Sequence, residues 1–102
     1  MTAKLEPIYP GEILYEEFMR PMGINPHRLA MSLRVPPPTV YEIVHGERSI
    51  SDEMALRLAR CFGTTPEFWV NLQSRYNLEV TRDKEQRRVD REVLVLAKES
   101  RE

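Results

Sequence analysis

Apolar side chains recur at helical spacing through the first 80 residues, in short stretches that proline and glycine separate. The first stretch opens at Pro10 and Gly11. We expect it to stop near Pro21 and Gly23, because proline blocks the continuation of a helix. Its apolar face is formed by Ile13, Leu14 and Phe18. The pattern predicts an amphipathic helix at the start of the chain.

The later stretches begin with residues that favour a helix N-terminus. Asn25, Ser51 and Thr65 can each accept a hydrogen bond from a free amide of the first helical turn. A third helix is expected to begin near Pro38, since a residue before proline is disfavoured in helical geometry, and to end at Gly46. The expected inner residues are Leu29, Ala30 and Leu33; Val40, Ile43 and Val44; Met54, Ala55, Leu58, Ala59 and Phe62; and Phe68, Trp69, Leu72 and Tyr76.

No segment up to residue 80 is typical of a strand, so the sequence predicts an all-α fold with a body of five short helices. We divide the chain into this body, residues 1–80, and a charged C-terminal extension, residues 81–102. Residues 82–92 are nearly all polar and are typical of a solvated helix or a mobile segment. Residues 93–97 are apolar, as a short strand or helix, and are expected to pack on the body or on a second subunit.

Composition narrows the setting but not the function. One cysteine, Cys61, has no partner for an internal disulfide, which fits a reducing cytosol. No apolar run approaches the roughly 20 residues of a membrane helix, and the N-terminus lacks the apolar stretch of a signal peptide, so we expect a cytoplasmic protein. The net charge of −1 does not favour nucleic-acid binding, and charge must therefore be considered locally.

Two segments have the spacing of a helix-turn-helix: a small residue, then a residue tolerant of left-handed geometry, then an apolar anchor. They are Ala30, Arg34 and Val40, and then Ala59, Gly63 and Trp69. Arg34 replaces the usual glycine, at a cost of about 1 kcal/mol. Spacing alone leaves a plain packing corner open as an interpretation of either segment.

The first segment is the better candidate for contact with DNA. In the second, Glu67 would face phosphates unfavourably and the helix is rich in large apolar groups, which indicates core or dimer surface. In the first, Thr39 and Tyr41 can meet base edges or thymine methyls. Arg34 and Arg48 flank this helix, with His45 on its outer side, and can hold phosphates.

Catalytic and metal-binding chemistry finds little support. Glu16 and Glu17 are adjacent and point to different helix faces, His27 and His45 lack other ligand types nearby in the sequence, and no phosphate-binding or dinucleotide motif is present. Cys61 has no histidine or acid beside it and is expected to be a partly buried, unreactive thiol. We expect neither an enzyme nor a cofactor or metal.

Longer strings carry a family resemblance. Three segments between about residue 7 and residue 80 resemble HigA-type antitoxins of the phage-repressor-like helix-turn-helix family. They are YPGEILYEEFMRPMGINPHRLA, VPPPTVYEIVHGERSIS and ALRLARCFGTTPEFWVNLQSRYNLE. The resemblance implies a repressor of its own operon that also neutralises a ribosome-dependent, mRNA-cleaving HigB-type toxin. It places Pro38, Thr39 and Tyr41 in the base-reading segment, His27 and Arg28 near the DNA backbone, and Arg48 after the recognition helix. Because Pro38 cannot donate a side-chain hydrogen bond, base readout is expected to be narrower or more shape-dependent than usual.

A homodimer follows from the low positive charge, because a monomer would make few phosphate contacts and bind weakly. The expected interface includes Trp69, Tyr76, Val93 and Val95. The alternatives are a repressor without a toxin partner, and a toxin-binding module with little role on DNA. For the toxin contact, the acidic first helix offers a surface suited to a basic partner, although a solvated helix face explains the same glutamates: Glu12, Glu16 and Glu17.

Overall fold

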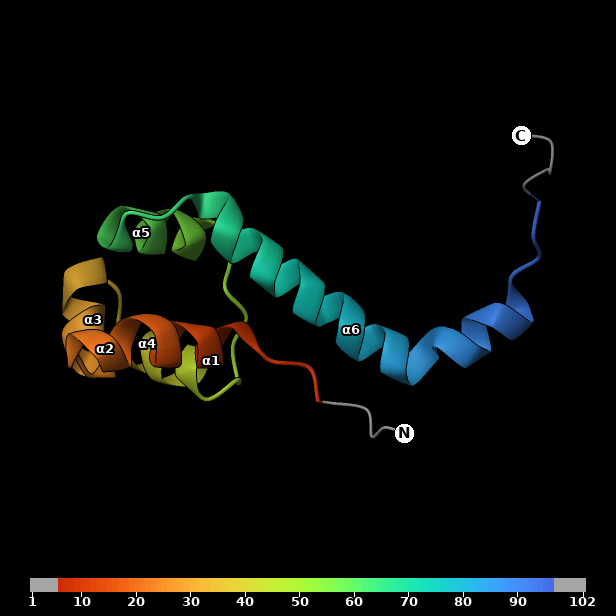
Figure 1. Cartoon of the computed structure of the whole chain (residues 1–102), viewed down its shortest axis with the longest axis horizontal. Coiled ribbons are helices and arrows are strands. Elements are labelled where there is room, and N and C mark those ends of the chain that lie inside the picture. The colour runs from red at the N-terminus through yellow and green to blue at the C-terminus, as the bar shows by residue number, and fades with distance from the viewer. Residues whose placement is uncertain (1–5, 97–102) are drawn as a thin grey trace.

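The computed structural model describes residues 6–96, and every regular element within that range is a helix (Figure 1). The first three elements, α1 (Pro10–Ile13), η1 (Leu14–Met19) and α2 (Arg20–Met22), follow one another without a gap as one N-terminal helix. The remaining elements are α3 (Pro26–Leu33), α4 (Pro37–Val44), α5 (Asp52–Phe62) and α6 (Pro66–Glu92). The prediction of an all-α fold with five helices is thereby confirmed.

Side-chain caps fix three of the helix starts. Asn25 Oδ1 accepts from the backbone amide of Arg28 at 2.8 Å. Ser51 Oγ accepts from the amide of Met54 at 3.1 Å, and Thr65 Oγ1 accepts from the amide of Phe68 at 3.1 Å. Each bond satisfies an amide that has no partner inside its own helix. The three caps predicted from the sequence are therefore confirmed.

The N-terminal helix includes Pro21 and stops near Pro21 and Gly23, as the sequence predicted. Its middle part, η1, is π-helical, and the wider turns end directly before the segment that holds Pro21. Proline lacks an amide hydrogen, and in a regular α-helix its ring meets the carbonyl four residues earlier. The helix ends at Met22, where Gly23 adopts a left-handed conformation with φ 67°.

Trp69 lies at the centre of the body and is 0% exposed. Its ring centroid is 5.0 Å from that of Phe18, and its Nε1 donates to Thr64 Oγ1 at 2.7 Å. The largest fully buried side chains around it are Leu14, Met19, Leu29, Val40, Ile43 and Leu58. Trp69 has no surface left for a second subunit, so the prediction that it contributes to a dimer interface is wrong.

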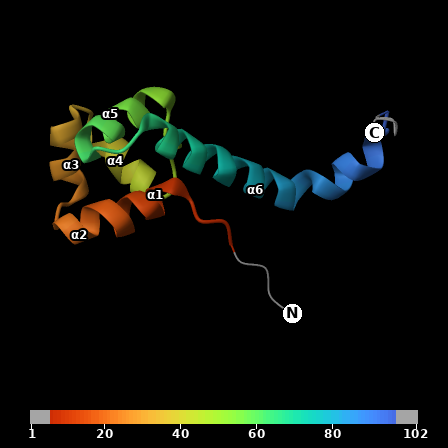
Figure 2. The same cartoon turned by 45° about the horizontal axis from the view of Figure 1, so that its top comes forward.

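Helix α6 extends far beyond the body (Figures 1 and 2). It is unbroken across residue 80, where the sequence suggested a change from body to extension, and its residues beyond Val80 are mostly exposed. Residues 93–96 follow as neither helix nor strand, and Leu96 is 90% exposed. This apolar run does not pack on its own body, while Ala97 lies outside the described residues. Within residues 6–96, no helix is both long and apolar enough to cross a membrane.

Candidate nucleic-acid interface

Helices α3 and α4 form a helix-turn-helix corner. Arg34 ends α3 with φ 63° and ψ 44°, the left-handed geometry that the spacing predicted. The amide of Val35 donates to the carbonyl of Ala30 at 3.1 Å, which closes the turn. Ala30 is fully buried, and a larger side chain there would push the helices apart.

Val40 and Ile43 of helix α4 face the core, and a row of exposed residues lies on another side of the helix. This row consists of Pro38, Tyr41 and His45, which are all exposed and fall at positions i, i+3 and i+7. Tyr41 is 43% exposed. We call these three residues the outer stripe.

Thr39 lies beside the outer stripe, not on it. It is half-buried and lines a depression between the start of α4 and the N-terminal end of α5, together with Arg34, Ser51 and Arg57. Arg57 Nη1 donates to the carbonyl of Leu33 at 2.9 Å, while Arg57 Nη2 pairs with Glu53 at 2.8 Å. Arg57 therefore ties α5 to the turn of the corner, a role that the sequence analysis missed.

Two polar contacts organise the far end of α4. His45 Nδ1 lies 2.7 Å from the carbonyl of Tyr41. Arg48 Nε donates to Glu42 Oε1 at 2.7 Å, and both side chains remain partly exposed. The sequence-predicted phosphate contacts thus fall at three places: His27 and Arg28 at the start of α3, Arg34 at the turn, and His45 and Arg48 at the end of α4.

The N-terminal helix supports α4 from behind. Gly11 packs so closely that a Cβ placed on it would lie 1.7 Å from the carbonyl oxygen of Ile43. Tyr9 lies against Gly46, with ring carbons 3.3 Å from where a Cβ of Gly46 would be. These contacts support the C-terminal end of α4, which His45 and Arg48 follow. The sequence analysis gave no role to Tyr9.

Gln73 holds the loop after α4 to α6. It is 8% exposed, and its Oε1 accepts from the buried amide of Ile50 at 2.8 Å. Its Nε2 donates to Asn77 Oδ1 at 2.9 Å. A polar residue on the same helical side as Trp69 was a signal for such a buried contact, because a buried amide needs a partner.

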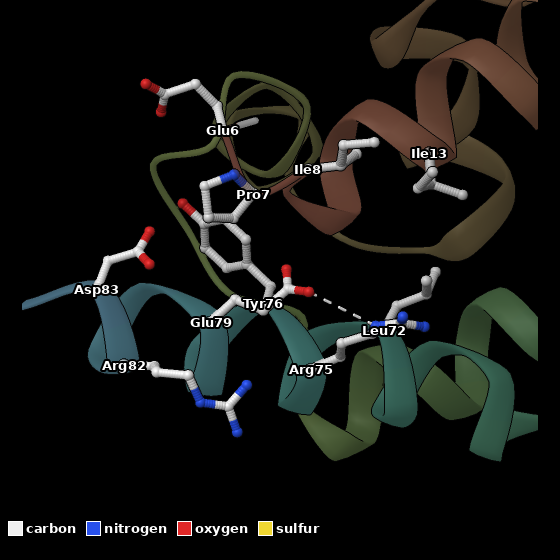
Figure 3. Close-up of a pocket in the computed structure, with 10 residues that line it drawn as sticks. All are labelled: Glu6, Pro7, Ile8, Ile13, Leu72, Arg75, Tyr76, Glu79, Arg82 and Asp83. Atoms are coloured by element: carbon white, nitrogen blue, oxygen red, sulfur yellow. Dashed lines mark ion pairs between the residues drawn. The ribbon is translucent and has the colours of Figure 1, made fainter. Parts of the chain in front are cut away.

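Tyr76 lines a groove between the segment before α1 and the middle of α6 (Figure 3). The ring of Tyr76 makes an edge contact with Tyr9, at a centroid distance of 6.4 Å. Arg75 and Glu79, which also line the groove, form an ion pair at 3.7 Å along α6. Tyr76 is only half-buried and keeps surface for a second subunit, as do the exposed Val93 and Val95.

The acidic candidates on the N-terminal helix, Glu12, Glu16 and Glu17, are all exposed. Glu16 Oε1 accepts from Arg20 Nη1 at 2.8 Å, and this hydrogen bond raises the pKa of Arg20.

Cys61 is exposed and not partly buried as expected, although local desolvation raises the pKa of its thiol. Among residues 6–96, no three histidine, cysteine or acidic side chains come together to hold a metal ion.

A helix-turn-helix family model matches residues 16–69, which include the whole corner. Antitoxin HigA-1 of Vibrio cholerae is 39% identical over 83 residues, covering 81% of this chain and 78% of that protein. A Pseudomonas aeruginosa antitoxin HigA, solved with the higBA promoter, superimposes with a TM-score of 0.87 at 44% identity, covering 89% of this chain and 99% of that chain. The chain belongs to the HigA family of helix-turn-helix antitoxins.

Virulence-associated protein I of Dichelobacter nodosus is also similar to this HigA-family chain. It is 44% identical over 79 residues, which cover 78% of the chain and 73% of that protein. The family is one of DNA-binding regulators and not of enzymes. Membership confirms the resemblance seen in the sequence.

Proposed function

We propose that the chain binds operator DNA of its own operon as a dimer, represses transcription, and neutralises an mRNA-cleaving HigB-type toxin. One observation carries the proposal: its fold matches nearly the full length of an antitoxin HigA that was solved with promoter DNA. The helix that corresponds to a recognition helix in this fold, α4, presents an exposed outer stripe. DNA binding and toxin neutralisation both belong to the cytoplasm, where we place the protein.

The outer stripe and Thr39 are the base-reading surface in this proposal. Pro38 and Tyr41 enter the major groove, and Thr39 reaches the edge of the groove from the adjoining depression. His27 and Arg28 approach the backbone from the free end of α3, and Arg34 and His45 approach it from either end of α4. These contacts supply positive charge locally in a chain of net charge −1.

Arg48 is the principal phosphate contact. Its Nε is engaged by Glu42, which fixes the guanidinium beside the end of α4. The terminal nitrogens keep their own donors, so Arg48 can hold a phosphate without leaving Glu42. Glu42 acts here as a positioning residue.

A dimer is needed because one corner makes few phosphate contacts. Two copies on half-sites one helical turn apart, roughly 34 Å, read a palindromic operator. Tyr76, Val93 and Val95 are the interface residues in this proposal, and residues 93–96 would lose their exposure on assembly. For the toxin, the exposed Glu12, Glu16 and Glu17 offer an acidic surface to a basic RNA-cleaving enzyme.

Separate variants test the two activities in cells that carry a reporter for the operon and a HigB-type toxin gene. Arg48→Ala should relieve repression and leave growth protected from the toxin. Reversing the charge at Glu16 and Glu17 should leave repression intact and reduce protection. Arg60→Ala, an exposed arginine on the outer side of α5, is the control for loss of positive charge. Full repression by Arg48→Ala would contradict the assigned DNA face, and unchanged protection by the double reversal would contradict the toxin surface.

A further inference from the structure

The leading end of α4 offers DNA very few hydrogen-bond donors. Pro37 and Pro38 occupy the first two helical positions, and neither has an amide hydrogen. The next amide, that of Thr39, donates to the carbonyl of Pro36 at 3.0 Å. The helix start therefore lacks the free amides that usually bind a phosphate or a base edge.

The exposed side chains at this end are apolar where they could meet a base. Pro36 and Pro38 expose pyrrolidine rings, and Tyr41 continues the surface one turn further along the outer stripe. The tyrosine ring adds an apolar face before its hydroxyl is reached. Hydrogen bonding to bases is thus left to Thr39 and to the tip of Tyr41.

Among the four bases, only thymine presents an apolar group in the major groove, its 5-methyl group. Thymine also carries the O4 acceptor, but its methyl group gives a proline ring an apolar contact, whereas beside the other bases the ring covers donors or acceptors with no such contact in return. An apolar leading end consequently favours thymine at the facing position and disfavours the other bases.

We infer that Pro38 and Tyr41 select thymines in each operator half-site by packing against their 5-methyl groups. The inference rests on the proposed function and deepens it, since it names the feature of DNA that the outer stripe reads. It differs from readout of DNA shape, in which the groove width matters and an individual methyl group does not. Thr39 and Arg48 then set the register and supply affinity for the backbone.

The test uses fluorescence anisotropy with labelled duplexes from the region upstream of the chain's own gene, and with a scrambled duplex. In one series each thymine is replaced singly by deoxyuridine, which keeps the hydrogen bonds of the base pair and removes only the methyl group. Burial of one methyl group corresponds to about a four-fold change in affinity, or roughly 16-fold when both half-sites are substituted. The loss should be confined to one or two positions in each half-site.

Variants assign the effect to the outer stripe. Pro38→Ala and Tyr41→Ala should each reduce the penalty for deoxyuridine at one of those positions to less than about two-fold, because the methyl contact is already gone. Pro66→Ala, which changes a proline in the first turn of α6 and distant in sequence from the corner, should keep the full penalty. Arg48→Ala should weaken thymine and deoxyuridine duplexes by the same factor.

The outcomes separate this inference from the proposed function. Preference for the upstream duplex with no deoxyuridine penalty at any position overturns the inference and leaves the function standing. A penalty that persists unchanged in both outer-stripe variants also overturns it. Equal, weak binding to the upstream and scrambled duplexes overturns the proposed function, and the inference with it.

Discussion

Replacing Gln73 by methionine removes the acceptor of a buried backbone amide while it keeps a long unbranched side chain in the same space. Gln73 Oε1 accepts from the amide of Ile50 at 2.8 Å, and Ile50 itself is 4% exposed. The amide therefore loses its partner in the folded state and regains one in the unfolded state.

A buried amide without a partner costs about 1–3 kcal/mol, and burial of the methionine thioether offsets only part of that. We expect the free energy of unfolding to fall by about 2 kcal/mol, which lowers the melting temperature of a domain of this size by roughly 8–16 °C. Thermal unfolding followed by circular dichroism measures the change directly.

Asn77→Ala is the matched control, because it removes the other partner of the Gln73 side chain at an exposed position. It should change the free energy of unfolding by less than about 0.5 kcal/mol. A melting temperature of Gln73→Met within about 2 °C of the parent would show that the Ile50 amide finds another partner, and the argument for this contact would fail.

Three further changes have defined outcomes. Arg34→Gly relieves the left-handed backbone strain and should raise the free energy of unfolding by about 1 kcal/mol. It should also lower the slope of log affinity against log salt concentration for operator DNA by about one. A destabilised variant would contradict the strain. Gly11→Ala forces α1 away from Ile43, so we expect the free energy of unfolding, measured by a thermal melt, to fall by about 3 kcal/mol and operator binding to weaken. A stability equal to the parent would contradict the close contact. Desolvation raises the pKa of Cys61, so less thiolate is present at neutral pH. Alkylation of the folded protein should therefore be slower than alkylation of the protein unfolded in denaturant. Equal rates would contradict the shift in pKa.

The helix boundaries that local chemistry controls were predictable from the sequence. Asn25, Ser51 and Thr65 each bond an amide three residues later, so both partners are close together in the chain. The left-handed turn at Arg34 was predictable for the same reason, from its place between two helical stretches. DNA contacts from these elements stay a prediction until they are measured.

The length of α6 was harder to predict because its second half packs against little of the body. Local pairs support it instead: Arg88 bonds both Glu85 and Glu92 on the helix surface. The absence of glycine and proline from residue 67 to residue 92 was the available signal for an unbroken helix. The apolar run after it was expected to find cover, and in the single chain it stays exposed.

Contacts between distant parts of the chain were beyond sequence reasoning. Gly11 against Ile43, and Gln73 against Ile50, each join residues more than 20 positions apart. Trp69 shows the same limit, because an aromatic residue on an amphipathic helix suits a core and an interface equally well until the surrounding helices are placed. The structure assigns it to the core, where it is 0% exposed.

In the proposed function, α4 reads a specific operator. Fluorescence anisotropy tests this reading of the operator. A duplex from upstream of the gene is titrated with the full chain at two salt concentrations, beside a scrambled duplex. We expect tighter binding to the upstream duplex, by a factor of about 10³ or more, and a marked loss of affinity at the higher salt concentration. Equal and weak binding to both duplexes would contradict it.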